Sequence, residues 1–284
     1  MSTTRDAGVS KVWFVTGATS GFGRAIAEEA IARGDRVVAT ARKTASLADL
    51  VAKAPDRVLL AELDVTRADQ VEAAVAAALA RFGAIDVLVN NAGFSIVGAV
   101  EETSEEALRE TMEPMFFGAV RLTRAVVPHM RERRSGTIVQ ITSMGGLTTA
   151  PGFGAYCAAK HALEGLSECL SLELAPFGVR VLIVEPGAFR TALFGAAFRR
   201  MPEIAAYAPT VGPVRAFAAD VHGGQAGDPA KAAVAIADAV ASEAPPLRLP
   251  LGADAVDGIR QKLGRIASDV DRTEAVARAT TFSG

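Results

Sequence analysis

The sequence predicts a doubly wound α/β fold, in which a seven-stranded parallel sheet is covered by helices on both faces. Short apolar runs alternate along the chain with longer stretches of helical periodicity. In addition, the first apolar run leads directly into a glycine-rich turn and a helix. The chain has 284 residues, half of them hydrophobic, which is enough for one large domain, and we expect no second domain.

The expected strands are short runs of apolar and β-branched residues, typical of a sheet buried on both faces. They lie near residues 12–16, 36–41, 58–63, 87–90, 137–142, 179–184 and 247–251. The expected helices carry apolar residues three and four positions apart. They lie near residues 23–33, 67–82, 104–133, 153–176 and 229–243, and a helical tail is expected over 253–284. Strands that alternate with helices in this way form parallel sheets.

The turn after the first expected strand has the features of a dinucleotide-binding loop. Gly17 permits a tight turn, Gly21 lets the backbone approach a pyrophosphate, and Gly23 allows close packing of the helix. The start of that helix offers free N–H groups to phosphate. A purely structural loop is the alternative. The residues of this segment expected to bind a cofactor are Gly17, Thr19, Ser20, Gly21, Phe22 and Gly23.

The end of the second expected strand indicates which dinucleotide binds. An NAD enzyme needs a carboxylate there for the ribose 2′-hydroxyl, and this chain has Ala41. Arg42 and Lys43 follow, and a guanidinium suits a 2′-phosphate because it combines a planar fork of donors with a permanent charge. We therefore expect NADP(H) in preference to NAD. Two solvated loop charges are the alternative, but they do not explain the missing acid.

Acid–base chemistry is expected around Tyr156 and Lys160, because residues four apart on a helix share one face. A nearby ammonium favours phenolate over phenol, so we expect the pKa of Tyr156 to fall below its usual value of about 10. Ser143 stands at the end of an expected strand, where ligands of open α/β sheets gather. Its hydroxyl can bind a carbonyl oxygen that Tyr156 protonates, and a strand-end cap is the alternative.

Taken together, these motifs resemble the short-chain dehydrogenase/reductase family. The resemblance runs from about Lys11 to Gly252 and implies a single Rossmann-type domain. It is carried by Thr16–Gly23, Asn90-Asn-Ala-Gly93, Ser143, Tyr156-x-x-x-Lys160 and Pro186-Gly187. The cofactor half would cover about 11–142, and the catalytic and substrate half would cover about 143–252.

The resemblance also implies a role for each matching residue. Tyr156 would be the general acid/base, Lys160 would lower its pKa and hold the nicotinamide ribose, and Ser143 would orient the substrate oxygen. Asp64 matches a position that contacts adenine, and helix capping is the alternative for Asp64 and Thr191. The other residues expected beside the cofactor are Val65, Asn91, Ala92, Gly93, Pro186, Gly187, Phe189 and Thr191.

One position departs from the family pattern. Relatives usually carry an asparagine three residues before Gly118, where it holds a water in a proton relay, and this chain has Met115. A thioether cannot replace an amide, and Pro114 lacks an N–H and is expected to kink the helix. Two interpretations remain open. Either backbone carbonyls and water move the protons, or the protein is an NADP-binding regulatory or interaction module with impaired turnover.

Substrate selection is expected in the segment 188–227, an insertion that interrupts the alternation of strands and helices. A lid with these apolar side chains favours an apolar ketone or secondary alcohol, and a packed lid that never touches ligand is the alternative. Arg199 and Arg200 are expected at the surface, with binding of an anionic group as their alternative role. The apolar residues concerned are Phe189, Leu193, Phe194, Phe198, Met201, Tyr207 and Phe217, together with Met144, Leu147 and Phe153.

Composition and charge argue against other classes of protein. The formal net charge of −2 and a pI near 6.0 give no electrostatic footprint for nucleic acid. No apolar signal core or membrane-spanning run is evident, so we expect a cytoplasmic protein. Cys157 and Cys169 are expected to be free thiols, and the histidines lack the spacing of a metal site. Because helices matching 104–133 and 153–176 pair between subunits in the family, the resemblance implies a homodimer or homotetramer.

Overall fold

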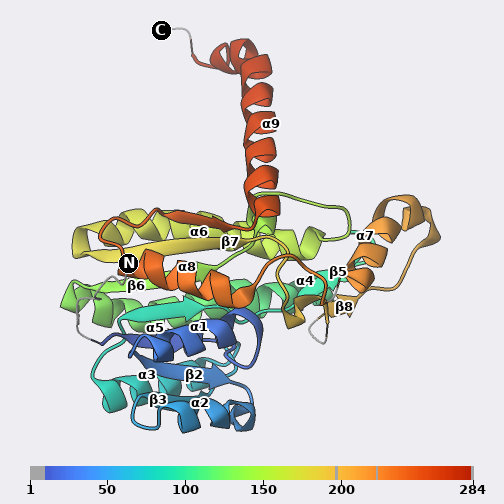
Figure 1. Ribbon diagram of the computed structural model, residues 1–284. Coiled ribbons are helices and arrows are strands. Elements are labelled where there is room, and N and C mark those ends of the chain that lie inside the picture. The colour runs from blue at the N-terminus through green and yellow to red at the C-terminus, as the bar shows by residue number, and fades with distance from the viewer. Residues whose placement is uncertain (1–9, 196–197, 222, 283–284) are drawn as a thin grey trace, which may run out of the picture.

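The computed structural model describes residues 10–195, 198–221 and 223–282. Its central feature is a parallel sheet of seven strands in the order β3-β2-β1-β4-β6-β7-β9, with helices on both faces (Figure 1). This arrangement confirms the predicted fold class. The strands of this sheet are β1 (Val12–Val15), β2 (Arg36–Ala41), β3 (Val58–Glu62), β4 (Val87–Asn90), β6 (Gly136–Ile141), β7 (Val179–Pro186) and β9 (Arg248–Leu251).

The helices supply one apolar layer on each face of the sheet. Helices α1 (Gly21–Ala32) and α8 (Pro229–Ala241) cover one face, and α3 (Ala68–Phe82) and α5 (Gly118–Arg133) cover the other. Alternate residues of β1 enter the two layers, because successive side chains of a strand point to opposite faces. The remaining helices are α2 (Ala48–Lys53), α4 (Glu105–Met112), α6 (Gly154–Leu174), α7 (Ala208–Asp220) and α9 (Ala253–Arg278).

The helix expected over 104–133 is interrupted. A π-helical turn, Glu113–Phe117, separates α4 from α5, and the Gly118 N–H donates to the carbonyl of Glu113, five residues back. Pro114 lies at the start of this turn and has no N–H to donate at α-helical spacing. The predicted kink is therefore present as a π-turn, a feature often found at functional sites.

Several elements were not predicted from the sequence. Helix α2 lies between β2 and β3, and a separate two-stranded parallel sheet joins β5 (Ser95–Val97) to β8 (Phe198–Arg200). Helix α7 occupies part of the segment 188–227, which we expected only as an insertion. In Figure 1 this second sheet and α7 lie together at one end of the main sheet.

Cys157 and Cys169 both lie on α6 and are free thiols, as expected. Within the described ranges, no helix is long and apolar enough to cross a membrane. Nor do those ranges contain a group of three or more His, Cys, Asp or Glu side chains that could hold a metal ion. His222, one of the three histidines, lies outside the described residues.

Candidate active site

A cleft of about 1150 Å³ opens where β1, β2, β4, β6 and β7 end, at the carboxyl edge of the sheet. This is the usual ligand site of an open α/β sheet. All three predicted catalytic residues line it, and so does every predicted cofactor-binding residue except Gly23. Residues that are far apart in the sequence therefore meet in one place.

The glycine-rich turn has the conformation that its sequence predicts. Gly17 and Gly21 adopt left-handed backbone angles, with φ of 64° and 56°. A Cβ on Gly23 would lie 2.4 Å from the carbonyl oxygen of Gly17, so this residue packs α1 against the turn and does not line the cleft. Ser20 at the N-cap of α1 makes no side-chain cap, and the first turn has no acidic residue. The N–H groups of this helix end therefore fit a phosphate group.

Hydrogen bonds join the turn after β1 to the loop after β4. The Thr16 hydroxyl accepts hydrogen bonds from the backbone N–H groups of Asn91 (2.8 Å) and Ala92 (3.0 Å). The Asn91 side-chain amide donates back to the Thr16 carbonyl at 2.8 Å. These contacts fix two walls of the cleft relative to each other.

Asp64, which follows β3, also lines the cleft. Its carboxylate accepts from the backbone N–H and the hydroxyl of Thr66, at 2.9 and 2.8 Å. Burial would raise the pKa of Asp64, but these hydrogen bonds and the charges of Arg42 and Arg67 outweigh burial and lower it. Asp64 thus caps a turn and also lines the cleft. Thr191 likewise accepts from the N–H of Leu193 at 3.3 Å while it lines the cleft.

Ser143 and Tyr156 lie side by side within the cleft. A Cβ on Gly145 would lie 3.3 Å from Cε1 of Tyr156 and 3.4 Å from Oγ of Ser143. Ser143 accepts from the Gly145 N–H at 3.0 Å and caps a short helical turn, so the capping alternative holds as well. Its hydroxyl donates a hydrogen bond to the carbonyl of Pro186 at 3.4 Å. The pair can therefore hold one oxygen atom of a ligand between them.

Burial dominates the acid–base properties of Tyr156 and Lys160. It raises the pKa of Tyr156 to about 12, although the Ser143 hydrogen bond acts in the opposite direction. Burial also lowers the pKa of Lys160 to about 8, against the influence of Glu164. The Lys160 ammonium donates to the carbonyl of Ile141 at 2.8 Å and lies 5.8 Å from the centre of the Tyr156 ring. The expected lowering of the Tyr156 pKa is therefore wrong for the protein by itself.

Met115 occupies the position where the family resemblance implies an asparagine. Its side chain is buried among apolar neighbours that include Ile96, Ala155 and Tyr156. A Cβ on Gly93 would lie 2.9 Å from Cγ of Met115, so the glycine makes room for the thioether. The site thus contains a hydrophobic contact in place of an amide.

A small cavity lies behind Met115. It measures about 10 Å³, and its lining includes Asn90, Pro114, Met115 and Lys160. The volume is close to that required by one water molecule. Oδ1 of Asn90 is buried and accepts no hydrogen bond from the residues that the structure describes. The cavity therefore offers polar partners to a water molecule beside the Lys160 ammonium.

Aromatic side chains pack together next to Tyr156, and of these Phe194 lines the cleft. Phe153 lies 6.3 Å from both Tyr156 and Phe194, measured between ring centres, and Phe194 lies 5.6 Å from Phe198. On the cofactor side, Phe22 and Phe189 are 5.0 Å apart. Phe153 and Phe198 pack near Phe194 but do not line the cleft. The other residues predicted for the substrate pocket that lie outside its lining are Met144, Leu147, Met201, Tyr207 and Phe217.

Several residues lining the cleft were missed by sequence reasoning, among them Phe94 and Glu110. Arg199 lies over the Phe94 ring, 4.3 Å from its centre, and pairs with Glu110 at 2.7 Å. Arg199 is thus a wall residue whose charge is already paired, and not only a surface charge. Phe94 directly follows the Asn90–Gly93 motif, and that position was the available signal.

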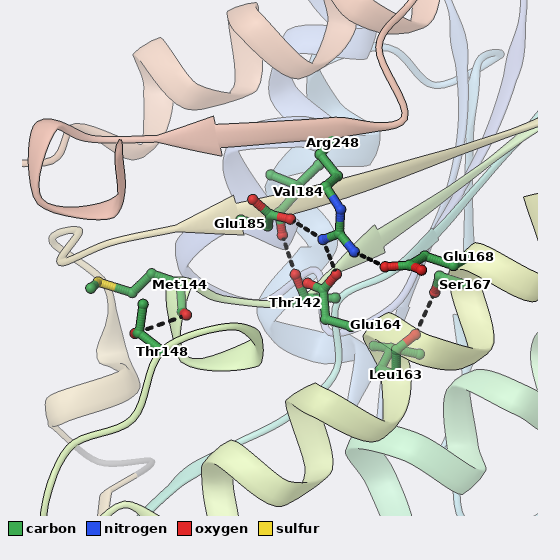
Figure 2. Close-up of polar contacts among 10 residues, drawn as sticks. All are labelled: Thr142, Met144, Thr148, Leu163, Glu164, Ser167, Glu168, Val184, Glu185 and Arg248. Carbon is green, nitrogen blue, oxygen red and sulfur yellow. Dashed lines mark hydrogen bonds and ion pairs between the residues drawn. The ribbon is translucent and has the colours of Figure 1, made fainter. Parts of the chain in front are cut away.

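A charged cluster supports the site from behind (Figure 2). Arg248 of β9 pairs with Glu164 and Glu168 of α6 and with Glu185 of β7. Glu164 and Glu185 are buried, and burial raises the pKa of Glu185. Because Glu164 lies one turn after Lys160, the cluster ties the catalytic helix to two strands of the sheet. Sequence reasoning did not predict it.

This fold and cleft define a dinucleotide-binding α/β protein with a tyrosine, a lysine and a serine at the carboxyl edge of its sheet. Residues 11–202 match the family model described as short chain dehydrogenase. The chain therefore belongs to the short-chain dehydrogenase/reductase family and is an NAD(P)-dependent oxidoreductase.

Named relatives agree with this assignment. The chain is 39% identical to "Oxidoreductase BOA17" of Botryotinia fuckeliana over 250 residues, which are 88% of this chain and 91% of that protein. It is 41% identical over 181 residues to a "3-ketodihydrosphingosine reductase" of Bacteroides thetaiotaomicron, covering 64% of this chain and 65% of that one.

Solved structures give the same result. A short-chain dehydrogenase from Streptomyces avermitilis has 54% identity and a TM-score of 0.91, covering 96% of this chain and 100% of that chain. One from Burkholderia cenocepacia in complex with NADP has 28% identity and a TM-score of 0.69, covering 96% and 98%. One from Burkholderia phymatum in complex with NAD, at 24% identity and a TM-score of 0.81 over 92% and 95%, shows the shared fold.

Proposed function

We propose that the protein is an NADP-dependent reductase or dehydrogenase that moves a hydride between the nicotinamide and an apolar ketone or secondary alcohol. The observation that carries the proposal is the pair of hydroxyls, Ser143 and Tyr156, set beside Lys160 in the cleft that also contains the glycine-rich turn. Oxidation of NADPH and NADH, followed at 340 nm with a panel of apolar ketones, tests it. Absence of turnover on every ketone and, in reverse, every secondary alcohol would contradict it.

Each side chain has a defined task in this reaction. When bound, the dinucleotide supplies or accepts the hydride. Ser143 donates a hydrogen bond to the substrate oxygen, and Tyr156 gives that oxygen its proton as negative charge develops. Lys160 holds the ribose and favours the phenolate that remains. Because burial keeps the Tyr156 hydroxyl protonated in the protein by itself, the tyrosine is prepared to act as an acid.

The preference for NADP(H) is supported by the wall at the end of β2. Arg42, Lys43 and Ser46 line the cleft there, so two cations and a hydroxyl lie where a 2′-phosphate would bind. Glu62 pairs with Ala41 across β2 and β3, but it does not belong to the cleft lining. No carboxylate of this strand end is therefore positioned for the 2′-hydroxyl of NAD.

Arg42→Ala is expected to raise the Kd for NADPH about 10- to 100-fold, because it removes a charge-assisted hydrogen bond to the 2′-phosphate. The Kd for NADH should stay within about threefold of the wild-type value. Fluorescence titration with both cofactors measures the effect. Arg67→Ala removes an exposed arginine that lies outside the cleft and serves as the control. Equal weakening of both cofactors by Arg42→Ala would argue against 2′-phosphate recognition.

An apolar substrate is supported by Met115, Leu193 and Phe194, which line the cleft together with Tyr156. The name of the Bacteroides relative, 3-ketodihydrosphingosine reductase, fits a ketone. We propose that 188–227 acts as the substrate lid, that 11–142 holds the cofactor and that 143–252 carries the catalytic residues. A buried ion pair at 2.7 Å between Arg215 of α7 and Glu102 attaches this lid to the cofactor half.

The presence of Met115 in place of an asparagine is compatible with an active enzyme. Pro114 of the π-helical turn lines both the cleft and the small cavity. We propose that a water in this cavity, held by hydrogen bonds to Lys160 and the backbone, passes protons from solvent to Lys160, which returns a proton to the Tyr156 phenolate. This agrees with the first of the two interpretations of Met115, and the oxidoreductase relatives do not favour the binding-module alternative.

Met115→Asn is therefore expected to leave kcat and its pH profile within about threefold of wild type. The buried amide, which lacks a designed partner, should lower the free energy of unfolding by about 1–3 kcal/mol. Steady-state kinetics from pH 6 to 10 and urea denaturation measure these quantities, with Met115→Leu as the apolar control. A large rise in kcat in the asparagine variant would mean that the wild-type relay is impaired.

The proposed assembly is a homodimer or homotetramer formed through α4, α5 and α6, as the family resemblance implies. Exposed apolar side chains on these helices and the π-turn, Leu108, Phe117 and Leu172, support this surface. The small carbonyl or alcohol substrate is the only other partner we propose. The cytoplasmic location expected from the sequence stays a prediction.

A further inference from the structure

Helix α9 leaves the body of the protein after its first turns. Ala255 and Ile259 are buried at its base, where a Cβ on Gly258 would lie 2.9 Å from Cε of Met144. Every residue from 263 to 282 is exposed. Figure 1 shows the helix projecting away from the sheet and its covering helices. From 263 to 278 the free part is about 24 Å long, at 1.5 Å per residue.

The free part carries an apolar stripe at heptad spacing. Its members are separated alternately by three and four residues, which is the spacing of a coiled-coil contact. We call this stripe the α9 seam, and it consists of Leu263, Ile266, Val270, Thr273 and Ala277. The exposed fractions of Leu263, Ile266 and Val270 are 56%, 47% and 59%. The same face of the helix continues toward the N-terminus through Ile259. It is therefore buried against the body at the base of α9 and exposed from Leu263 onward.

A lone helix of this kind is not stable by its own propensity. Isolated helices of up to about 15 residues are marginal in water, and helices in proteins depend on packing of an apolar face. Gly264, which directly follows Leu263 of the seam, lowers the helix propensity further. The free part of α9 therefore needs a partner surface that is apolar, straight and of similar length.

We propose that this partner is α9 of a second copy of the chain, paired in the antiparallel direction. The base of α9 joins the body, so a parallel pair would bring two bodies together at the same end. A parallel pair would also set Asp269 of one copy against Glu274 of the other, since these residues occupy flanking heptad positions that meet in parallel dimers. Like charges at such positions oppose pairing.

An antiparallel pair centred near Ser268 removes both problems. Leu263 then lies opposite Thr273, and Ile266 lies opposite Val270, so the two β-branched apolar side chains fill the middle of the contact. Arg260 of each copy lies next to Glu274 of the other, which gives two attractive charge pairs. The bodies lie at opposite ends of the pair.

The only like-charged contact in this register is Asp269 with its symmetry mate. Each Asp269 carboxylate already pairs with Arg272 of its own helix, which reduces that repulsion. The proposed contact is separate from the surface of α4, α5 and α6. It does not depend on the catalytic function.

Ile266→Glu tests the contact because it places a charge in the centre of the seam. Sedimentation equilibrium is expected to give a native mass of at least two chains and half that mass for Ile266→Glu. Ser268→Glu places the same residue on the opposite face of α9 and should keep the native mass. Circular dichroism and NADPH binding, both expected to be unchanged, show that the variants are folded. A monomeric wild type, or an Ile266→Glu variant with the native mass, would overturn the proposal.

Cysteine cross-linking tests the direction of pairing. In a Cys169→Ser background, Ala267→Cys is expected to form an interchain disulfide under mild oxidation, because position 267 meets its own symmetry mate only in the antiparallel register. Ser268→Cys on the opposite face is the matched control and should stay reduced. If Ala267→Cys fails to cross-link while Ile266→Cys does, the helices pair in parallel and the antiparallel proposal is wrong.

Discussion

Tyr156→Phe is expected to reduce turnover by about 10²- to 10⁴-fold, the usual effect of removing a general acid. The substitution deletes one hydroxyl and keeps the ring, which packs edge-on against Phe153 at 6.3 Å. Cofactor affinity should therefore stay close to the wild-type value. Steady-state oxidation of NADPH with the best ketone of the panel, and fluorescence titration of NADPH in parallel, measure the two quantities.

The chain provides a matched control, because its other tyrosine lies outside the cleft. Tyr207 belongs to the lid, and its hydroxyl donates a hydrogen bond to Glu101 at 2.6 Å. Tyr207 is not among the residues that line the cleft. Tyr207→Phe should leave kcat unchanged. If Tyr156→Phe also retained full turnover, proton donation would have to come from another group, and the proposed role of Tyr156 would be wrong.

Arg248→Met is expected to produce the largest loss of stability, about 3–5 kcal/mol in the free energy of unfolding, as found when one partner of a buried ion pair is removed. Among the residues that the structure describes, Arg248 is the one cation in contact with both buried carboxylates, those of Glu164 and Glu185. Without it, each would have to be protonated or stay charged in an apolar environment. Urea denaturation at pH 7, with fluorescence of Trp13 as the signal, measures the change.

Two glutamine variants separate this effect from a general loss of polar contacts. Glu168→Gln changes an exposed carboxylate of the same cluster and should cost less than about 1 kcal/mol. Glu185→Gln has a predicted pH dependence. Since burial raises the pKa of Glu185, the folded protein keeps the proton of this carboxyl to a higher pH than the unfolded chain, which releases it near pH 4.3.

The contribution of Glu185 to the free energy of unfolding should therefore fall as the pH rises above that value, and Glu185→Gln should remove this contribution. Denaturation at pH 5 and pH 8 tests this expectation. An Arg248→Met variant as stable as Glu168→Gln would show that the cluster contributes little.

The sequence predicted the main sheet well because its strands are buried on both faces. An uninterrupted apolar run such as residues 181–184 is best explained as a buried strand in a chain that alternates strands with helices. The short strands β5 and β8 were missed because each has only three residues and its partner lies about a hundred residues away. Pattern reading uses local periodicity, and these two strands depend on a contact that no local pattern describes.

The residues of the cleft were predictable for a different reason. Gly17, Ser143 and Tyr156 belong to motifs in which backbone conformation or chemistry restricts the residue type. Phe94, Glu110 and the cluster around Arg248 have no such restriction, and only the folded chain brings them together. The direction of the Tyr156 pKa shift was wrong for the same reason, since spacing on a helix reveals a neighbouring charge but not complete burial.

The position of β1 in the middle of the sheet has a consequence for synthesis on the ribosome. The backbone N–H of Val12 is bound by Asp86, which is 74 residues later in the chain. At translation rates of about 5–20 residues per second, the apolar strand Val12–Val15 waits on the order of 4–15 seconds for that side of the sheet to exist. During this time its unpaired edge is exposed to other nascent chains. Yield in a heterologous host should consequently depend on chaperone capacity and growth temperature more than on the stability of the finished protein.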